Sequence, residues 1–183
     1  MAKDFPALSA HHRDFIDRQH MFFTATAAPD SRVNLSPRST DMLRIIGDNS
    51  VVYLDRTGSG NETAAHLKAD GRMTIMMCAT EGPPLILRLY GRGRAIARGS
   101  AEYAELLAKE YGGTEPLGAR QMIRLDFDLV KTSCGYGVPL HDYVGERDTM
   151  DKWANAKGPE GLESYRQEFN RVSMDGLPTG LPD

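Results

Sequence analysis

The feature that most constrains the fold is a series of short apolar segments with the two-residue period of β-strands, joined mainly by short turns. In the clearest of them, Gln121 to Lys131, alternate residues are apolar and share one face: Ile123, Leu125, Phe127 and Leu129. Further strands are expected at Met21 to Ala28, Val33 to Ser36, Leu43 to Ile46, Val51 to Asp55, Met73 to Ala79 and Leu85 to Ala97. A doubly wound sheet would need regular strand–helix alternation. We therefore predict a mainly β fold, a small closed or partly closed β-barrel with peripheral helices.

Helices are expected singly around this framework, over residues 8–20, 61–69 and 100–111, the first with Ser9 as its N-cap. Beyond Lys131 a glycine-rich stretch leads to two helical segments, divided at Gly158-Pro159. This change predicts a barrel domain over residues 1–145, which includes the N-terminal helix. Residues 146–183 are expected to form a helical extension and tail that packs on the barrel or on a partner subunit.

Composition restricts the partners and the compartment. The 183 residues suit one domain, and 22 basic against 25 acidic residues give a net charge of −3, which argues against a nucleic-acid partner. The basic residues are 16 Arg and 6 Lys, an excess that suits anion binding but also follows from codon bias. Two isolated cysteines and five scattered histidines predict no metal site. Without a signal-like or membrane-spanning segment, we expect a cytoplasmic protein with no membrane partner.

The sharpest local motif is Gly58-Ser59-Gly60-Asn61-Glu62-Thr63, which follows an expected strand and opens an expected helix. Free backbone N–H groups and a partial positive charge at a helix N-terminus favour an anion, and flexible glycines allow it to approach. Asn61 and Thr63 could add side-chain donors to a phosphate. The alternative is an ordinary glycine loop with Asn61 as N-cap.

Three other segments are candidate binding elements. Alternation places Arg32, Asn34 and Ser36 on one strand face, where they could hydrogen-bond a planar heterocycle, and Pro37 is expected to end the ladder. Arg88 lies between leucines and is the arginine most expected to act inside the barrel. Residues 133–139 have glycines around an aromatic residue, which suits a loop against a ligand or simply a connection. In each case a solvated strand or loop is the alternative.

Taken in order, these motifs make the sequence resemble the pyridoxamine 5′-phosphate oxidase-like family of FMN-binding split barrels. The resemblance covers about residues 10–145. It rests on FFTATAAPDSRVNLSPRS, VVYLDRTGSGNETAAHLKADGR, MTIMMCA and LILRLYGRGRAI, and SCGYGVPL with GERDTMDKWA is similar to a subgroup whose substrates are undefined. It implies a six-stranded split barrel and a homodimer with FMN in a groove between the subunits.

The resemblance also implies the residues that hold the cofactor. Asn34, Leu35 and Ser36 would lie by the polar edge of the flavin ring, and Ser59, Asn61 and Thr63 by its phosphate. Arg32 or Arg38 would add positive charge near the phosphate. Arg88 would reach the flavin from the barrel floor, and Cys134 and Tyr136 of the second subunit would close the site.

Departures from the family pattern bear on the substrate. Glu62 stands where the oxidases usually have basic residues, Pro37 stands about where they have a substrate-facing lysine, and the arginine-rich C-terminus is absent. We therefore expect an FMN-dependent oxidoreductase with a small-molecule substrate other than pyridoxamine phosphate. The alternative is a non-catalytic protein that binds haem, a deazaflavin or another flat anionic ligand on the same barrel, with His66 or a histidine of the tail as the axial ligand for haem.

Overall fold

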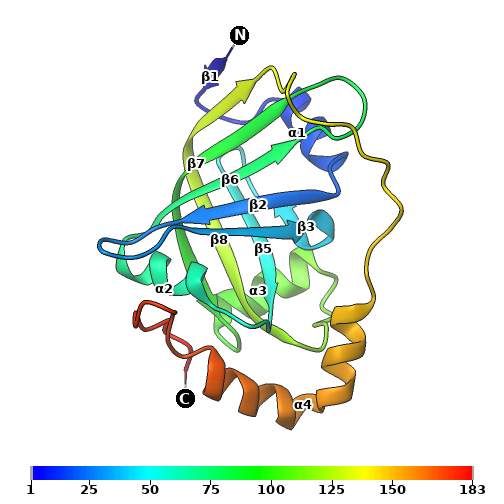
Figure 1. The fold of residues 1–183 in the computed structure, drawn as a ribbon. Coiled ribbons are helices and arrows are strands. Elements are labelled where there is room, and N and C mark those ends of the chain that lie inside the picture. The colour runs from blue at the N-terminus through cyan, green and yellow to red at the C-terminus, as the bar shows by residue number, and fades with distance from the viewer. Residues whose placement is uncertain (1, 183) are drawn as a thin grey trace.

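The computed structural model describes residues 2–182, which form one curled antiparallel sheet with helices at its edges (Figure 1). The sheet has eight strands within these residues, in the order β3-β2-β6-β7-β8-β5-β4, and β1 pairs with β8. Their bounds are β1 Lys3–Phe5, β2 Met21–Thr26, β3 Asn34–Ser39, β4 Leu43–Ile45, β5 Ser50–Arg56, β6 Arg72–Cys78, β7 Ile86–Ala97 and β8 Ala119–Ser133. Because the path ends at β3 and β4, the barrel is split rather than closed.

Strand alternation forms the core on the inner face of this curl. Phe22, Ile75, Leu87, Leu89 and Leu125 are fully buried there, as expected when every second side chain of a curled sheet points inward. A second apolar cluster lies between the other face of the sheet and α3 (Ala101–Glu110). The largest contribution to the hydrophobic free energy of folding therefore comes from the inward-facing half of each strand.

The short helices begin and end where local signals predict. Ser9 caps α1 (Ala10–Asp17) by accepting the His12 N–H at 3.3 Å, and His12 Nδ1 accepts the Ser9 N–H at 3.1 Å. Helix α2 (Glu62–Ala69) ends before Gly71, whose φ of 88° is readily reached only without a Cβ. One 3₁₀ turn, η1 (Thr40–Met42), connects β3 to β4.

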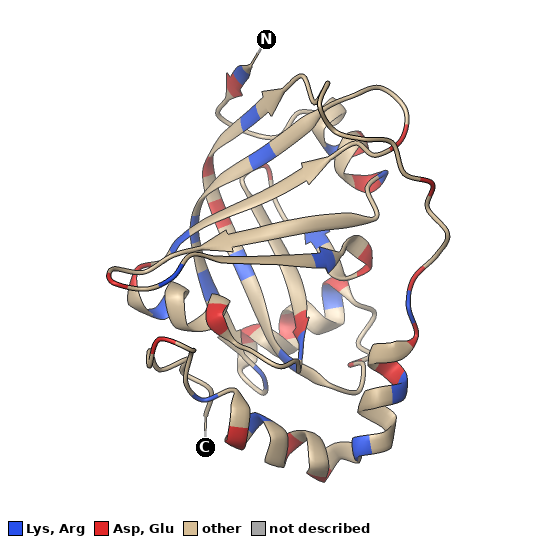
Figure 2. Cartoon of the chain, in the orientation of Figure 1, with Lys and Arg blue, Asp and Glu red and all other residues tan. Residues whose placement is uncertain are grey.

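The C-terminal helix α4 (Thr149–Phe169) is bent at Gly158, which has φ 66° and ψ 174° and precedes Pro159. The expected division at this pair is confirmed as a kink between two helical segments. Helix α4 runs beneath the open end of the barrel, and the tail then turns back toward α2 (Figure 1). Figure 2 shows that both signs of charge are spread along α4.

The fold class predicted from the sequence is confirmed, and six strands of at least six residues make up most of the sheet. The structure adds the three-residue strand β1, and the strand expected at Leu43 to Ile46 is the three-residue β4. The expectation that Pro37 ends a ladder is wrong, because Pro37 pairs with Phe23 inside β3. β3 is an edge strand, where a missing N–H on the solvent side breaks no ladder bond.

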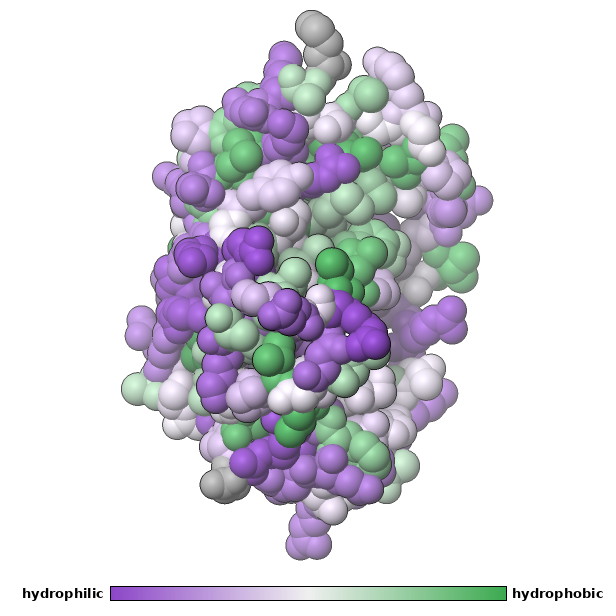
Figure 3. All heavy atoms as spheres, turned by 60° about the vertical axis from the view of Figure 1, so that its left-hand side comes forward, coloured by the Kyte–Doolittle hydropathy of each residue, from purple (hydrophilic) through white to green (hydrophobic). Residues whose placement is uncertain are grey.

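Among residues 2–182, no helix is both long enough and apolar enough to cross a bilayer. On the face shown in Figure 3, hydrophilic residues predominate and hydrophobic ones gather in small groups.

Candidate functional site

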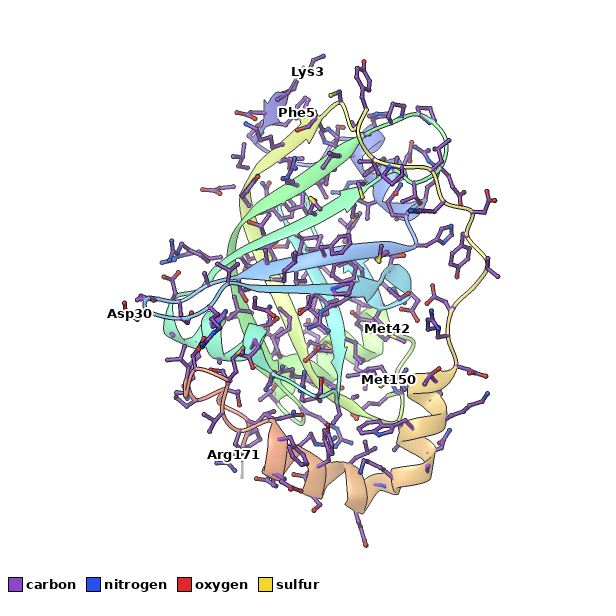
Figure 4. All side chains as sticks on the ribbon, viewed as in Figure 1. Lys3, Phe5, Asp30, Met42, Met150 and Arg171 are labelled. Atoms are coloured by element: carbon purple, nitrogen blue, oxygen red, sulfur yellow. The ribbon has the colours of Figure 1, made fainter. Side chains whose placement is uncertain are left out.

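A cleft of about 340 Å³ lies where β3, the loop at residues 57–61 and the start of α2 meet. Met150, labelled in Figure 4 at the start of α4, contributes to its wall. The sequence motif and the expected ring-facing strand are therefore brought together by the fold. The lining includes seven residues from the two predicted segments and the strand between them: Asn34, Ser36, Arg38, Arg56, Ser59, Asn61 and Thr63.

Three arginines line this cleft, of which Arg120 is almost fully buried and paired with Asp55. Arg38 donates one bond to Asp55 Oδ1 at 2.7 Å, and Arg56 donates to the Leu117 carbonyl and to Asp151. The Nε of each is buried and has no partner among the described residues. Since a guanidinium carries five N–H donors, both side chains keep unused donors at the cleft, which suits an anion.

Asp55, which lies beneath the cleft, is the counter-charge for Arg38 and Arg120. Its carboxylate is buried and accepts bonds from Arg38, Arg120 and Gln121 at 2.7 to 3.1 Å. Burial alone would raise the pKa of Asp55, but the guanidinium groups of Arg120 and Arg38 outweigh it and hold the pKa below its usual value. The same environment affects Tyr53, which lies 4.8 Å below the Arg38 guanidinium. Burial raises the pKa of Tyr53 to about 12, although Arg38 opposes the shift.

The start of α2 is open to an anion, but Asn61 contributes differently from the prediction. Its side chain accepts from Gln121 Nε2 at 2.8 Å and donates to the Asn170 carbonyl at 3.3 Å, so it points into the protein. No side chain caps the helix. The first-turn N–H groups therefore lack the usual side-chain acceptor. We assign the Asn61 side chain to holding the loop, and its backbone N–H remains available to a ligand.

Asn34, Ser36 and Thr63 form one hydrogen-bonded row across the cleft. Asn34 Nδ2 donates to Thr63 Oγ1 at 3.1 Å and to Thr26 Oγ1 at 3.2 Å, while Ser36 donates to Asn34 Oδ1 at 3.0 Å. Because Thr63 accepts here, its own hydroxyl proton is available for another acceptor. Fixed hydroxyls beside arginine donors suit a phosphate or the polar edge of a heterocycle.

Glu62, the acidic residue that could oppose a phosphate, lines the cleft. Its carboxylate accepts the backbone N–H of Met174, at 3.1 Å to Oε1 and 3.3 Å to Oε2. The C-terminal tail therefore offsets part of the carboxylate's charge, which still counts against an anion in this cleft.

A larger cavity of about 660 Å³ adjoins the cleft and shares Pro37 and Arg38 with it. It lies between β2, β3 and an extended segment, residues 138–147, which we call the strap. The strap runs from the end of β8 to α4 on the right of Figure 1. Its His141 N–H donates to the Thr80 carbonyl at 2.9 Å, and Tyr143 stacks on His20 with ring centres 3.6 Å apart.

Other predicted site residues lie away from the cleft. Arg32 pairs with Asp175 of the tail. Leu35 is 63% exposed on β3, and Tyr136 is 83% exposed. Cys134, also exposed, follows β8. Within one chain these residues do not meet the anion-binding residues, so their contacts with a cofactor stay predictions.

The expectation that Arg88 acts inside the barrel is wrong in its orientation. Its neighbours Leu87 and Leu89 point into the core, so alternation turns Arg88 to the outer face, where it donates to Ser133 Oγ at 3.2 Å. A contact between Arg88 and a cofactor would have to be made on that face.

Sequence reasoning missed Arg56 and Arg120, although both lie at the cleft. Arg56 ends β5 directly before the glycine loop, and that adjacency was a usable signal. Arg120 comes from β8, more than 50 residues away, and only the β5–β8 register brings it beside Asp55.

The ligands that haem or a metal would need are not evident here. His66 is 1% exposed, its Nδ1 shares a hydrogen bond with Thr26 at 3.1 Å, and it lies on the inward side of α2. Within residues 2–182 no cluster of three or more His, Cys, Asp or Glu side chains has the geometry of a metal site.

Comparison with known proteins links this site to a family. The profile of a family described as Pyridoxamine 5′-phosphate oxidase matches residues 8–134. The pyridoxamine 5′-phosphate oxidase family protein ustO of Aspergillus flavus is 35% identical over 190 residues, which cover 95% of this chain and 76% of that protein.

Two solved structures share the fold at low identity. HupZ of Group A Streptococcus superimposes with a TM-score of 0.53 and 17% identity, over 67% of this chain and 91% of that one. HutZ, described as a heme storage protein of Vibrio cholerae, gives 0.52 and 18%, over 70% and 96%. At such identities the likeness establishes the fold alone.

Proposed function

This chain belongs to the pyridoxamine 5′-phosphate oxidase family, and on that premise we propose that it is an FMN-binding flavoprotein and an oxidoreductase for a small molecule. The observation that carries the proposal is that Arg38 and Arg56 both line the cleft at the open start of α2 and use only some of their guanidinium donors within the chain. A bound phosphate would accept charge-assisted hydrogen bonds from the remaining donors.

The residues present fit the phosphorylated flavin. Arg38 and Arg56 would bind its phosphate together with the Thr63 hydroxyl and the backbone N–H groups of residues 59–63. Asn34 and Ser36 would face the ring from β3. FMN, when bound, supplies hydride or electron transfer. The chain's own residues bind and orient the cofactor, and Asp55 keeps Arg38 in place.

We further propose that a second copy of this chain covers the ring. Val33 and Leu35, on either side of Asn34, are 73% and 63% exposed, and β3 is an edge strand with unused backbone groups. A homodimer would bury these side chains, and it would allow Arg88, Cys134 and Tyr136 to approach the site from the partner.

The substrate is proposed to occupy the 660 Å³ cavity beneath the strap, which adjoins the cleft at Pro37 and Arg38. Pro37 cannot provide the amine of a lysine, so recognition of pyridoxamine phosphate as in the oxidases proper is not expected. We name no acid or base, because several titratable side chains line this cavity, among them His20, His141 and Tyr143, and none is singled out by its contacts.

The purified protein is expected to be yellow and to release FMN on denaturation. Arg56→Gln should weaken FMN binding at least about tenfold, because it removes charged donors to the phosphate. Arg98→Gln is a matched control, since Arg98 pairs with Glu115 outside the cleft. Titration of the apoprotein, followed by flavin fluorescence, measures both. A colourless protein that does not bind added FMN would overturn the proposal.

A haem-binding function is the second candidate, because one protein of the same fold, HutZ, is described as a heme storage protein. The buried His66 disfavours it in this chain. A Soret band that is lost in His66→Ala would support haem over flavin.

A further inference from the structure

Asn170, the residue that follows α4, makes a set of contacts that the proposed function does not use. It is fully buried, and its Nδ2 donates to the Gly58 carbonyl at 2.9 Å. Its Oδ1 accepts from Arg120 Nη1 at 2.8 Å, and its backbone carbonyl accepts from Asn61 Nδ2. This one C-terminal residue therefore reaches the glycine loop and β8 with its side chain and the start of α2 with its backbone carbonyl.

The tail holds Asn170 in this position. Thr179 Oγ1 donates to the Asn170 carbonyl at 2.7 Å, and the Thr179 N–H donates to the Arg171 carbonyl at 3.0 Å. One turn earlier on α4, Arg166 Nη1 donates to Thr57 Oγ1 at 3.0 Å. The end of α4 and the tail thus form a buried polar contact with the loop, and polar groups buried in this way are costly to leave unpaired.

These contacts decide which way the loop's peptide groups face. In a trans peptide the carbonyl oxygen and the following N–H point in opposite directions. Asn170 binds the Gly58 carbonyl, and Arg120 binds the Gly60 carbonyl at 2.9 Å. The N–H groups of Ser59 and Asn61 are therefore turned away from the buried network, on the side of the cleft. Backbone N–H groups that face the same side of a loop can form an anion-binding concavity.

We propose that Asn170 is a positioning residue that sets the loop at residues 57–61 for the phosphate, so that the C-terminal extension makes the site selective for FMN over riboflavin. This inference rests on the proposed function. Riboflavin has the same ring but no phosphate, so a residue that acts through the loop should affect only FMN.

The test compares dissociation constants of FMN and riboflavin for the full-length apoprotein. Asn170→Ala should weaken FMN binding about tenfold. The dissociation constant of riboflavin should change less than about twofold. Thr179→Val removes one bond to the Asn170 carbonyl and should give a smaller loss with the same selectivity. Ser164→Ala, an exposed position on α4, is the matched control and should change neither.

A purely structural role makes a different prediction. If Asn170→Ala lowers the affinity for both flavins equally, or for neither, the proposal is wrong while FMN binding itself stands. If wild type binds neither flavin, both proposals fail together. If Asn170→Ala does not fold, Thr179→Val is tested in the same way. A ratio of the FMN to the riboflavin dissociation constant that equals the wild-type ratio would then overturn the inference.

Discussion

Asp55 is the residue on which the charged groups beneath the cleft converge. Arg38, Arg120 and Gln121 all donate to its buried carboxylate. A buried carboxylate that loses its partners, or partners that lose the carboxylate, leaves uncompensated charge in a medium of low polarity. At this scale Asp55 both stabilises the fold and fixes the Arg38 side chain at the cleft.

Asp55→Asn is expected to lower the free energy of unfolding by about 3 kcal/mol, because it leaves Arg38 and Arg120 without their shared counter-charge. Asp48→Asn is the matched control, since Asp48 is exposed and its pair with Arg13 should contribute less than about 1 kcal/mol. Urea denaturation at pH 7 measures both. Equal stabilities for the two variants would contradict the role given to Asp55.

The pH dependence of stability should also reveal Asp55. Its pKa is lower in the folded than in the unfolded state, so its contribution is complete above the unfolded value of about 3.9 and is lost as pH falls through the folded pKa. The difference in unfolding free energy between wild type and Asp55→Asn should therefore shrink below about pH 4. Denaturation at a series of pH values checks this, and a difference that stays constant to pH 2 would argue against it.

At the scale of elements, β7 and β8 form the longest strand pair, and their register depends on one glycine. The register shifts between Tyr90 and Gly91, so the strands contain a bulge there. A Cβ on Gly91 would meet the backbone of Asp126 and Phe127 at distances that real side chains do not show. The bulge bends the sheet that carries Arg120 to the cleft.

Gly91→Ala should destabilise the protein by more than about 2 kcal/mol, because a backbone cannot yield as a flexible side chain can. Gly137→Ala is the matched control, since a Cβ there meets no atom within 4 Å and its backbone is not in the left-handed region. Thermal unfolding of the two variants gives the comparison. A Tm for Gly91→Ala within a degree or two of wild type would show that the strands can shift.

At the scale of the whole molecule, the site is made of parts from three distant segments. β3 and the 57–61 loop supply the cleft, β8 supplies Arg120, and the C-terminal segment supplies Asn170 and the Met174 N–H that binds Glu62. In the proposed homodimer a second copy would complete the ring-binding side over β3.

Leu35→Glu is expected to shift the protein from dimer to monomer, because it places a charge in an apolar contact. Ala104→Glu, which adds the same charge to an exposed position of α3, should leave the dimer intact. Sedimentation velocity distinguishes the two states. A wild-type protein that is monomeric at micromolar concentration would exclude the proposed covering of the ring.

The sequence by itself determined most strand positions, the kink at Gly158-Pro159, the capping of α1 by Ser9 and a mainly β barrel, because these follow from local periodicity and turn chemistry. The resemblance to a known family, rather than periodicity, implied the split barrel and a shared role for the glycine loop and β3. Only the tertiary structure decided that Arg120 lines the cleft and that the Asn61 side chain turns inward. Those outcomes depend on strand register and on contacts between residues 60 to 112 positions apart. Local patterns carry no information about such contacts, because the register and curvature of the whole sheet determine which distant side chains meet.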